Sequence, residues 1–308
     1  MTKAIRRVVC IGSGLIGSGW AAHFLRCGLD VVAFDRDPTR GAYLEAQVKA
    51  AWPSLERLGL RDGASLDRLQ FASNLDAALE GADFVQESAF EDEELKIDLL
   101  SEIDRRLPAD RVIASSSSGF LAERLRSQCR HGDRVIVGHP FNPPYLIPLV
   151  EIAGVTPTNA SVVEAAKAFY EWSGMKVVTL QREIRGYIAN RIQSAVLREV
   201  LYMVEQGIAS VADIDAAMSF GPARRWAFMG PSAVYYLGGG SPEGYRAFID
   251  LLVSEIHQDY AAPASFVPDR GLTERYVAEV TAWMSGTSYG ALRAKRDEGL
   301  VSIEKAIG

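Results

Sequence analysis

Short apolar runs alternate with longer amphipathic segments between residues 6 and 181. The apolar runs, which predict buried strands, lie at residues 6–12, 30–35, 83–88, 111–118, 134–140, 148–154 and 175–181. Amphipathic segments such as 92–106 predict helices between them. Strands buried on both faces and separated by helices are typical of a mostly parallel sheet with helices on each side. This part of the chain therefore predicts a doubly wound α/β fold.

The alternation stops after residue 185. Residues 187–207 place apolar side chains at helical spacing, and Gly207 at the end of this segment is a typical helix stop signal. A length of 308 residues also suits two domains. We therefore expect one domain at 1–185 and an all-helical domain at 186–308.

A glycine motif joins the first predicted strand to the first helix. Gly12, Gly14 and Gly17 form G-x-G-x-x-G, and Asp35 ends the next strand. These glycines permit a tight turn, close approach of a pyrophosphate and close helix packing. Asp35 would bind ribose hydroxyls and repel a 2′-phosphate, although Arg36 could accommodate one. The motif predicts a Rossmann-type domain that binds NAD through Gly12, Gly14, Leu15, Ile16, Gly17 and Asp35.

His139 ends a predicted strand, where a doubly wound sheet places its ligand crevice. The turn-rich segment 140–145 lets the chain double back and bring Glu151 beside it. A carboxylate within an apolar run needs a partner. A His–Glu pair suits a general base that removes a hydroxyl proton while hydride leaves carbon, but it also suits a buried structural pair.

Two further polar groups are candidates for holding a substrate oxygen. Ser115 to Ser118 follow another strand, and Asn190 begins the first helix of the second half. The serine run could equally cap the next helix.

Charge and cysteine content limit which partners, metals and cellular settings are expected for this protein. Lys and Arg number 33 against 39 Asp and Glu, a net charge of −6 that argues against a nucleic-acid partner. The three cysteines show no metal-ligand spacing, so we expect a reduced, cytoplasmic setting and no metal. Glycines interrupt the N-terminal apolar stretch, so neither a signal peptide nor a membrane span is expected.

The whole chain resembles the 3-hydroxyacyl-CoA dehydrogenase family. The matching segments are V-C-I-G-S-G-L-I-G at 9–17, Q-E-S-A-F-E-D-E-E-L-K at 86–96, S-S-S-S at 115–118, G-H-P-F-N-P-P at 138–144, P-L-V-E at 148–151 and G-Y-I-A-N-R at 186–191. The resemblance implies a catalytic set of Ser118, His139, Glu151 and Asn190. It also implies that Glu91, Lys96 and Asn142 serve the cofactor. The helical domain would form a homodimer.

Within the family, the closest resemblance is to the branch that oxidises L-carnitine. A second branch, that of λ-crystallin and L-gulonate oxidation, is also similar to this chain. This competing resemblance rests on a sequence pattern that ends at Pro231. An acyl-CoA substrate is disfavoured because residues 48–71 carry four positive and three negative side chains, a poor clamp for CoA. We expect NAD-dependent oxidation of a small L-3-hydroxy acid to its 3-oxo product. A non-catalytic, crystallin-like NAD-binding protein is the alternative from another class.

A quaternary ammonium substrate calls for aromatic faces. The candidates are Phe141, Tyr145, Tyr187, Trp226 and Tyr235, each of which could instead be part of the core. Arg185 could hold a substrate carboxylate or cap the turn between the domains.

Overall fold

A computed structural model describes residues 5–153, 160–241, 243–257, 261–263 and 265–307. The chain divides into two compact units. The first contains Met1–Asn190 and Asp297–Lys305, and the second contains Arg191–Arg296 and Ala306–Gly308.

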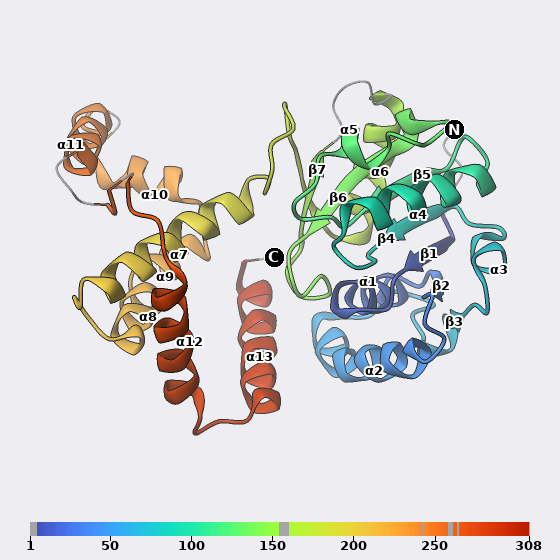
Figure 1. Cartoon of the computed structure of the whole chain (residues 1–308), viewed down its shortest axis with the longest axis horizontal. Coiled ribbons are helices and arrows are strands. Elements are labelled where there is room, and N and C mark those ends of the chain that lie inside the picture. The colour runs from blue at the N-terminus through green and yellow to red at the C-terminus, as the bar shows by residue number, and fades with distance from the viewer. Residues whose placement is uncertain (1–4, 154–159, 242, 258–260, 264, 308) are drawn as a thin grey trace. The chain divides into compact units, whose positions relative to one another are not determined.

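An eight-stranded sheet forms the centre of the first unit (Figure 1). The strands are β1 (Arg7–Ile11), β2 (Asp30–Phe34), β3 (Leu69–Phe71), β4 (Phe84–Glu87), β5 (Val112–Ser115), β6 (Val135–Pro140), β7 (Leu149–Ala153) and β8 (Lys176–Thr179). Their order is β3-β2-β1-β4-β5-β6-β7-β8, and only the β6–β7 pair is antiparallel. The predicted mostly parallel, doubly wound sheet is confirmed.

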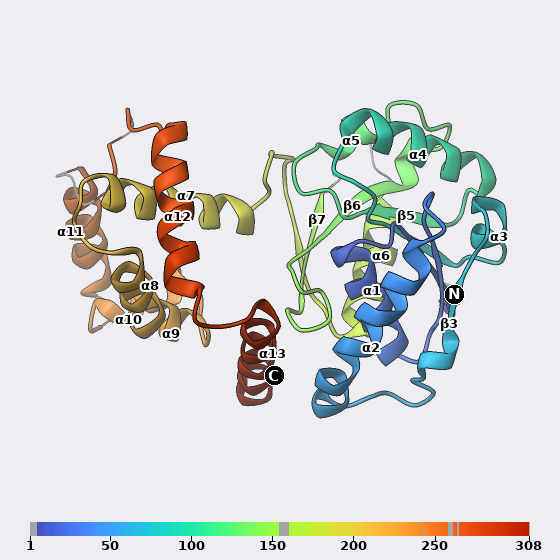
Figure 2. The same cartoon turned by 60° about the horizontal axis from the view of Figure 1, so that its bottom comes forward.

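Helices cover both faces of this sheet (Figure 2). They are α1 (Leu15–Arg26), α2 (Arg40–Leu58), α3 (Leu75–Leu79), α4 (Glu93–Arg106), α5 (Ala122–Leu125) and α6 (Ala160–Ser173). Alternate residues along each strand face opposite sides, so that Val8 packs with α1, α2 and α6 while Val9 packs with α3, α4 and α5. These two buried clusters hold the strand ends in place.

The antiparallel return of β7 beside β6 places the predicted base and carboxylate together. The turn between the strands contains a cis peptide bond at Asn142-Pro143. In the resulting register His139 lies directly opposite Glu151. A parallel crossover needs a dozen or more residues, whereas an antiparallel return can be short.

The remaining helices follow β8. They are α7 (Ala189–Glu205), α8 (Val211–Phe220), α9 (Pro222–Trp226), α10 (Pro231–Gly238), α11 (Tyr245–His257), α12 (Arg270–Met284) and α13 (Tyr289–Ile307). The expected change to helices is confirmed, and none of the helices in the described ranges is long and apolar enough to cross a membrane. Residues 297–305 of α13 group with the first unit: Val301 joins its core, and Asp297 accepts a hydrogen bond from Tyr145.

Candidate active site

The glycine turn between β1 and α1 leaves open space at one position and none at two others. Gly12 has a φ of +94°, and a Cβ there would lie 2.5 Å from the Ser88 carbonyl oxygen. A Cβ on Gly17 would overlap the carbonyl oxygen of Gly12. A Cβ on Gly14 would meet no atom within 4 Å, and α1 begins there without a side-chain cap. The backbone N–H groups of this helix terminus are therefore available to an anion such as a pyrophosphate.

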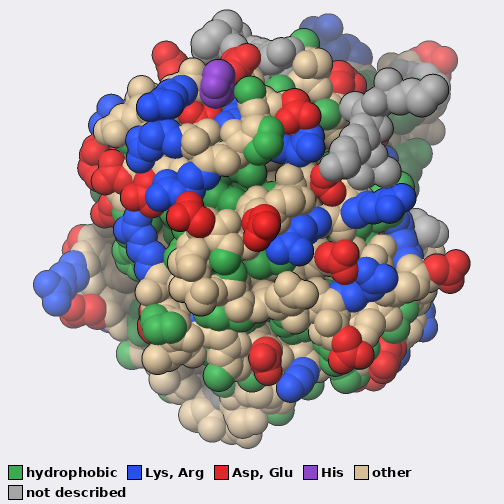
Figure 3. Space-filling view, turned by 90° about the vertical axis from the view of Figure 1, so that its right-hand side faces the viewer, with side chains coloured by type: hydrophobic (Ala, Val, Ile, Leu, Met, Phe, Trp, Pro, Cys, Tyr) green, Lys and Arg blue, Asp and Glu red, His purple; other side chains and the backbone are tan. Residues whose placement is uncertain are grey.

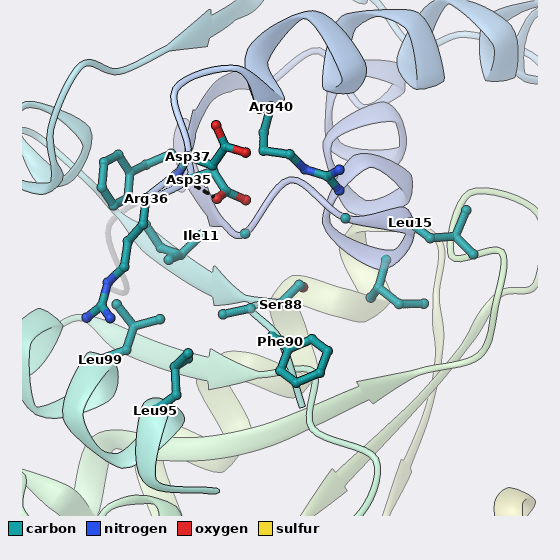
Figure 4. A pocket seen from close by; sticks show the side chains of 15 residues that line it. Ile11, Leu15, Asp35, Arg36, Asp37, Arg40, Ser88, Phe90, Leu95 and Leu99 are labelled. Atoms are coloured by element: carbon teal, nitrogen blue, oxygen red, sulfur yellow. Dashed lines mark hydrogen bonds between the residues drawn. The ribbon is translucent and has the colours of Figure 1, made fainter. Parts of the chain in front are cut away.

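A cavity of about 540 Å³ opens beside this turn (Figure 4). Asp35, Asp37 and Arg40 line one side, and Phe90, with Leu95 and Leu99 of α4, lines the other. Gly12, Gly14, Leu15 and Ile16 complete the wall at the helix terminus. The cavity combines apolar walls with a few fixed polar groups, as dinucleotide sites do.

Asp35, the first residue after β2, is fixed by two hydrogen bonds. Its carboxylate accepts hydrogen bonds from the backbone N–H groups of Ser13, at 2.7 Å, and Asp37, at 3.1 Å. Arg36 lies 3.9 Å from Glu102, and Arg40 donates to the Ser13 carbonyl. The side of the cavity that would receive a ribose carries two carboxylates and two arginines, and both arginines already have protein partners, which favours free hydroxyls over a 2′-phosphate.

His139 and Glu151 form a buried pair. The distance from His139 Nδ1 to Glu151 Oε2 is 2.9 Å. Burial raises the pKa of Glu151, but hydrogen bonds from His139, Ala189 and Ile188 outweigh it, so this pKa lies below its usual value. A carboxylate only accepts hydrogen bonds, so Nδ1 carries the hydrogen, and Nε2 of the neutral ring carries none and can accept a proton.

The other carboxylate oxygen of Glu151 holds the start of α7. Oε1 accepts hydrogen bonds from the backbone N–H groups of Ile188, at 2.8 Å, and Ala189, at 3.0 Å. The positive end of the helix dipole adds to this stabilisation of the carboxylate. Asn190, one residue further along α7, places Nδ2 3.5 Å from His139 Nε2. The structure therefore brings His139, Glu151 and Asn190 together.

Tyr187 packs against the histidine. Its ring centroid lies 5.0 Å from that of His139, and its hydroxyl donates to the Phe120 carbonyl at 2.6 Å. It is a non-glycine residue with a positive φ, 48°, so its backbone is strained. Burial raises its pKa well above the usual value. We conclude that Tyr187 is a neutral ring that fixes the plane of the imidazole.

The serine run does not cap the following helix, since Leu121 stands at the N-cap of α5 and no side chain caps this helix. Ser117 and Ser118 bind Glu91 instead: Ser117 Oγ and the Ser118 N–H each donate to Glu91 Oε1 at 2.8 Å. The Ser118 side chain remains exposed. Burial raises the pKa of Glu91, but Lys96 and these hydrogen bonds lower it further than burial raises it.

Glu87 is a buried residue of this region that the sequence analysis missed. It is fully buried at the end of β4, and its Oε1 lies 2.8 Å from Lys96 Nζ. Ser115 donates to its other oxygen at 2.5 Å. The available signal was a carboxylate within the apolar run 83–88, the same signal that identified Glu151.

The remaining predicted residues have different surroundings. Phe141 is half-buried and Asn142 exposed in the turn after His139. Tyr145 is 5% exposed, and its hydroxyl is committed to Asp297. Arg185 is exposed and donates from Nε to the Gly119 carbonyl at 3.2 Å, in the loop between β5 and α5. Trp226 ends α9 in the second unit, and Tyr235 lies on α10 of that unit.

Comparison with known proteins identifies the family. The NAD-binding domain of 3-hydroxyacyl-CoA dehydrogenase matches residues 7–184, and the C-terminal domain matches residues 186–261. L-carnitine dehydrogenase of Streptomyces griseus is 45% identical over 99% of this chain and 90% of its own. L-carnitine dehydrogenase of Streptomyces coelicolor is 44% identical over 99% of this chain and 95% of its own.

A solved structure has the same fold along the whole chain. It is that of 5-formyl-3-hydroxy-2-methylpyridine 4-carboxylic acid 5-dehydrogenase, an NAD+-dependent dismutase. The two chains are 25% identical, with a TM-score of 0.84 and 99% of each chain covered. The matched domains, the glycine turn and the relatives all indicate the same family. The chain belongs to the 3-hydroxyacyl-CoA dehydrogenase family and is an NAD-dependent oxidoreductase that acts on a CH–OH group.

Proposed function

We propose that this protein oxidises the 3-hydroxyl of L-carnitine to give 3-dehydrocarnitine, with NAD as the hydride acceptor. The observation that carries the chemistry is the buried His139–Glu151 pair, in which His139 Nε2 carries no hydrogen and lies 3.5 Å from Asn190 Nδ2. The substrate is proposed from the name of relatives that are 45% and 44% identical along nearly the whole chain.

His139 acts as the general base. Its Nε2 takes the hydroxyl proton, and the Glu151 carboxylate stabilises the imidazolium that forms. Asn190 Nδ2, 3.5 Å from Nε2, and the exposed Ser118 hydroxyl hold the reacting oxygen. Because Glu151 also binds the start of α7, it fixes the base and Asn190 with respect to each other.

The residues of the glycine turn fit NAD. Its pyrophosphate would lie at the start of α1, where Gly14 leaves space, and its adenosine ribose at Asp35. NAD supplies a nicotinamide ring that accepts the hydride from C3. Glu91, held by Lys96 and the serine run, and exposed Asn142 are proposed to serve the nicotinamide end.

Carnitine carries both a cationic trimethylammonium group and a carboxylate. Aromatic faces suit the cation, and in the first unit the half-buried Phe141, two residues after His139, offers one. Arg185 suits the carboxylate: it is exposed, and its Nε donates to the carbonyl of Gly119, the residue after Ser118. Tyr145 and Tyr187 are 5% and 0% exposed, and their hydroxyls are bound to Asp297 and to the Phe120 carbonyl, so neither ring offers a face to the cation.

Two of the four basic residues in the segment that would clamp CoA are paired with carboxylates. Lys49 lies 3.7 Å from Glu45, and Arg68 lies 2.6 Å from Asp30. On the face of the molecule in Figure 3, basic and acidic side chains are interspersed outside the grey residues. Both observations favour a small substrate over a multiply charged one.

A substrate panel tests the proposal. NADH formation is followed at alkaline pH with L-carnitine, L-gulonate and 3-hydroxybutyryl-CoA in parallel. We expect turnover of L-carnitine, with kcat/KM at least a hundredfold above the other two. Preferred turnover of L-gulonate or of the acyl-CoA would overturn the choice of substrate, and NAD binding without any turnover would favour the crystallin-like alternative.

We also propose that the chain works as a homodimer formed through residues 186–308, in the cytoplasm. The second unit exposes several large apolar side chains, which are Ile192, Leu197, Phe220, Phe228 and Leu237. Exposed apolar groups mark an association surface where they form one contiguous patch. The free thiols of Cys10, Cys27 and Cys129 suit a reducing compartment. Light scattering should give twice the mass of one chain, and a monomer would contradict the dimer.

A further inference from the structure

A closed ring of polar contacts links the ends of β4 and β5 to the start of α4. Lys96 Nζ lies 2.8 Å from Glu87 and 3.4 Å from Glu91. Glu91 accepts from Ser117 Oγ at 2.8 Å, and the Ser117 N–H donates to Ser115 Oγ at 3.2 Å. Ser115 Oγ donates back to Glu87 at 2.5 Å, which closes the ring. We call these five residues the Glu87–Lys96 ring.

The lysine of this ring is directed at protein oxygens. Its ammonium donates to Glu87 at 2.8 Å and to the Ala89 carbonyl at 3.1 Å, and its side chain is 1% exposed. Two of the three ammonium donors are therefore hydrogen-bonded within the protein, and the ion pair with Glu91 adds a second carboxylate as counter-charge. We infer that Lys96 serves the cofactor through the carboxylates that it holds.

The ring carries two carboxylates and one ammonium, a net charge of −1. Glu87 is fully buried and lies closer to Lys96 than Glu91 does, so it takes the larger share of the ammonium charge. The side chain of Glu91 is 39% exposed, and its Oε1 also accepts from the Ser118 N–H. The surplus negative charge therefore lies on the side of the ring that faces Ser118.

We propose that Glu87 is a positioning residue that keeps a surplus negative charge on Glu91, and that this charge raises the affinity for NAD+ relative to NADH. The inference rests on the proposed placement of the nicotinamide near Glu91. The oxidised ring is a cation and the reduced ring is neutral, so a nearby carboxylate stabilises only the oxidised form. The effect assists oxidation of the alcohol.

Equilibrium binding of each nucleotide without substrate tests this proposal. In Glu87→Gln the amide oxygen still accepts hydrogen bonds, but the ring becomes neutral because Lys96 now balances Glu91. NADH affinity is followed by its fluorescence and NAD+ affinity by calorimetry. We expect the ratio of Kd for NAD+ to Kd for NADH to rise about tenfold, with NADH affinity nearly unchanged.

The control is Glu94→Gln. Glu94 lies on the same helix and is paired with Arg124 at 3.0 Å, outside the ring, so the substitution removes the same charge and should leave the ratio unchanged. A purely structural role of Glu87 would weaken both nucleotides together and leave the ratio at its wild-type value, which would overturn the proposal.

A second variant covers the case in which Glu87→Gln does not fold. Glu91→Gln makes the same change in net charge at a partly exposed side chain and should raise the ratio in the same direction. An unchanged ratio in that variant would also overturn the proposal. Because no substrate is present, the result is independent of whether L-carnitine is the substrate.

Discussion

Replacing Glu151 by glutamine should nearly abolish turnover while leaving NAD binding intact. The native carboxylate accepts from His139 through one oxygen and from Ile188 and Ala189 through the other. An amide has a single acceptor atom. If that oxygen keeps the two backbone N–H groups, the NH₂ group faces Nδ1 and can bind it only when Nδ1 is unprotonated. The neutral ring then carries its hydrogen on Nε2 and cannot accept the substrate proton there.

The size of the expected fall in kcat follows from the same geometry. Two unit charges about 4 Å apart interact by about 4 kcal/mol at an effective dielectric constant of about 20. The side chains of His139 and Glu151 are 6% and 2% exposed, so solvent screens this interaction little. Losing it from the imidazolium raises the barrier by about that amount, which lowers kcat roughly a thousandfold.

The assay combines steady-state kinetics with NADH titration. We expect kcat for Glu151→Gln to fall about a thousandfold, and the NADH dissociation constant to stay within about twofold because the glycine turn is untouched. Glu164→Gln is the matched control, since Glu164 is exposed on α6 of the same unit. A fall of less than about tenfold in kcat, with intact nucleotide binding, would refute the role assigned to Glu151.

Three further predictions concern the base, the glycine turn and acid stability. His139→Gln should lower kcat by about 10²–10⁴-fold with little change in NADH affinity, and a retained kcat would remove the histidine from the mechanism. Gly17→Ala should destabilise the fold by about 1–3 kcal/mol in urea because its methyl group overlaps the Gly12 carbonyl, whereas Gly14→Ala should keep stability and weaken only NADH binding; equal stabilities of the two variants would contradict this. Burial raises the pKa of Asp104, but Arg134 and two backbone N–H groups lower it below its usual value, so its contribution to stability is complete above about pH 4 and is lost as the pH falls through the lowered pKa. Asp104→Asn should cost about 3–5 kcal/mol at pH 7, because buried Arg134 loses its counter-charge, and should lose less stability than wild type between pH 7 and pH 3; equal losses in urea unfolding would contradict this.

The strands that are buried on both faces could be predicted from the sequence, because long apolar runs have few alternative structures. Strand β3 was not predicted. It has three partly exposed residues, Leu69–Phe71, at the sheet edge, and its pairing with β2 depends on the fold as a whole. The grouping of residues 297–305 with the first unit could not be predicted either, since it rests on contacts such as Tyr145 with Asp297, which are far apart in the sequence.

The pairing of His139 with Glu151 could be predicted because a turn-rich segment separates two apolar runs, and a buried carboxylate requires a partner. The second role of Glu151, holding the start of α7, could not be predicted, since Ile188 lies 37 residues away in the sequence. Glu87 carried the same buried-carboxylate signal, but its partner Lys96 is nine residues away on a helix, where no turn indicated the contact.

The most direct test of the account is to follow the hydrogen on C3 of the substrate. Purified protein is incubated with NAD+ and L-carnitine that carries deuterium at C3, and the NADH is analysed by mass spectrometry. We expect one deuterium in each NADH molecule formed, with 3-dehydrocarnitine as the other product. NADH that forms without the label, or no NADH from L-carnitine in a protein that binds NAD+, would contradict it.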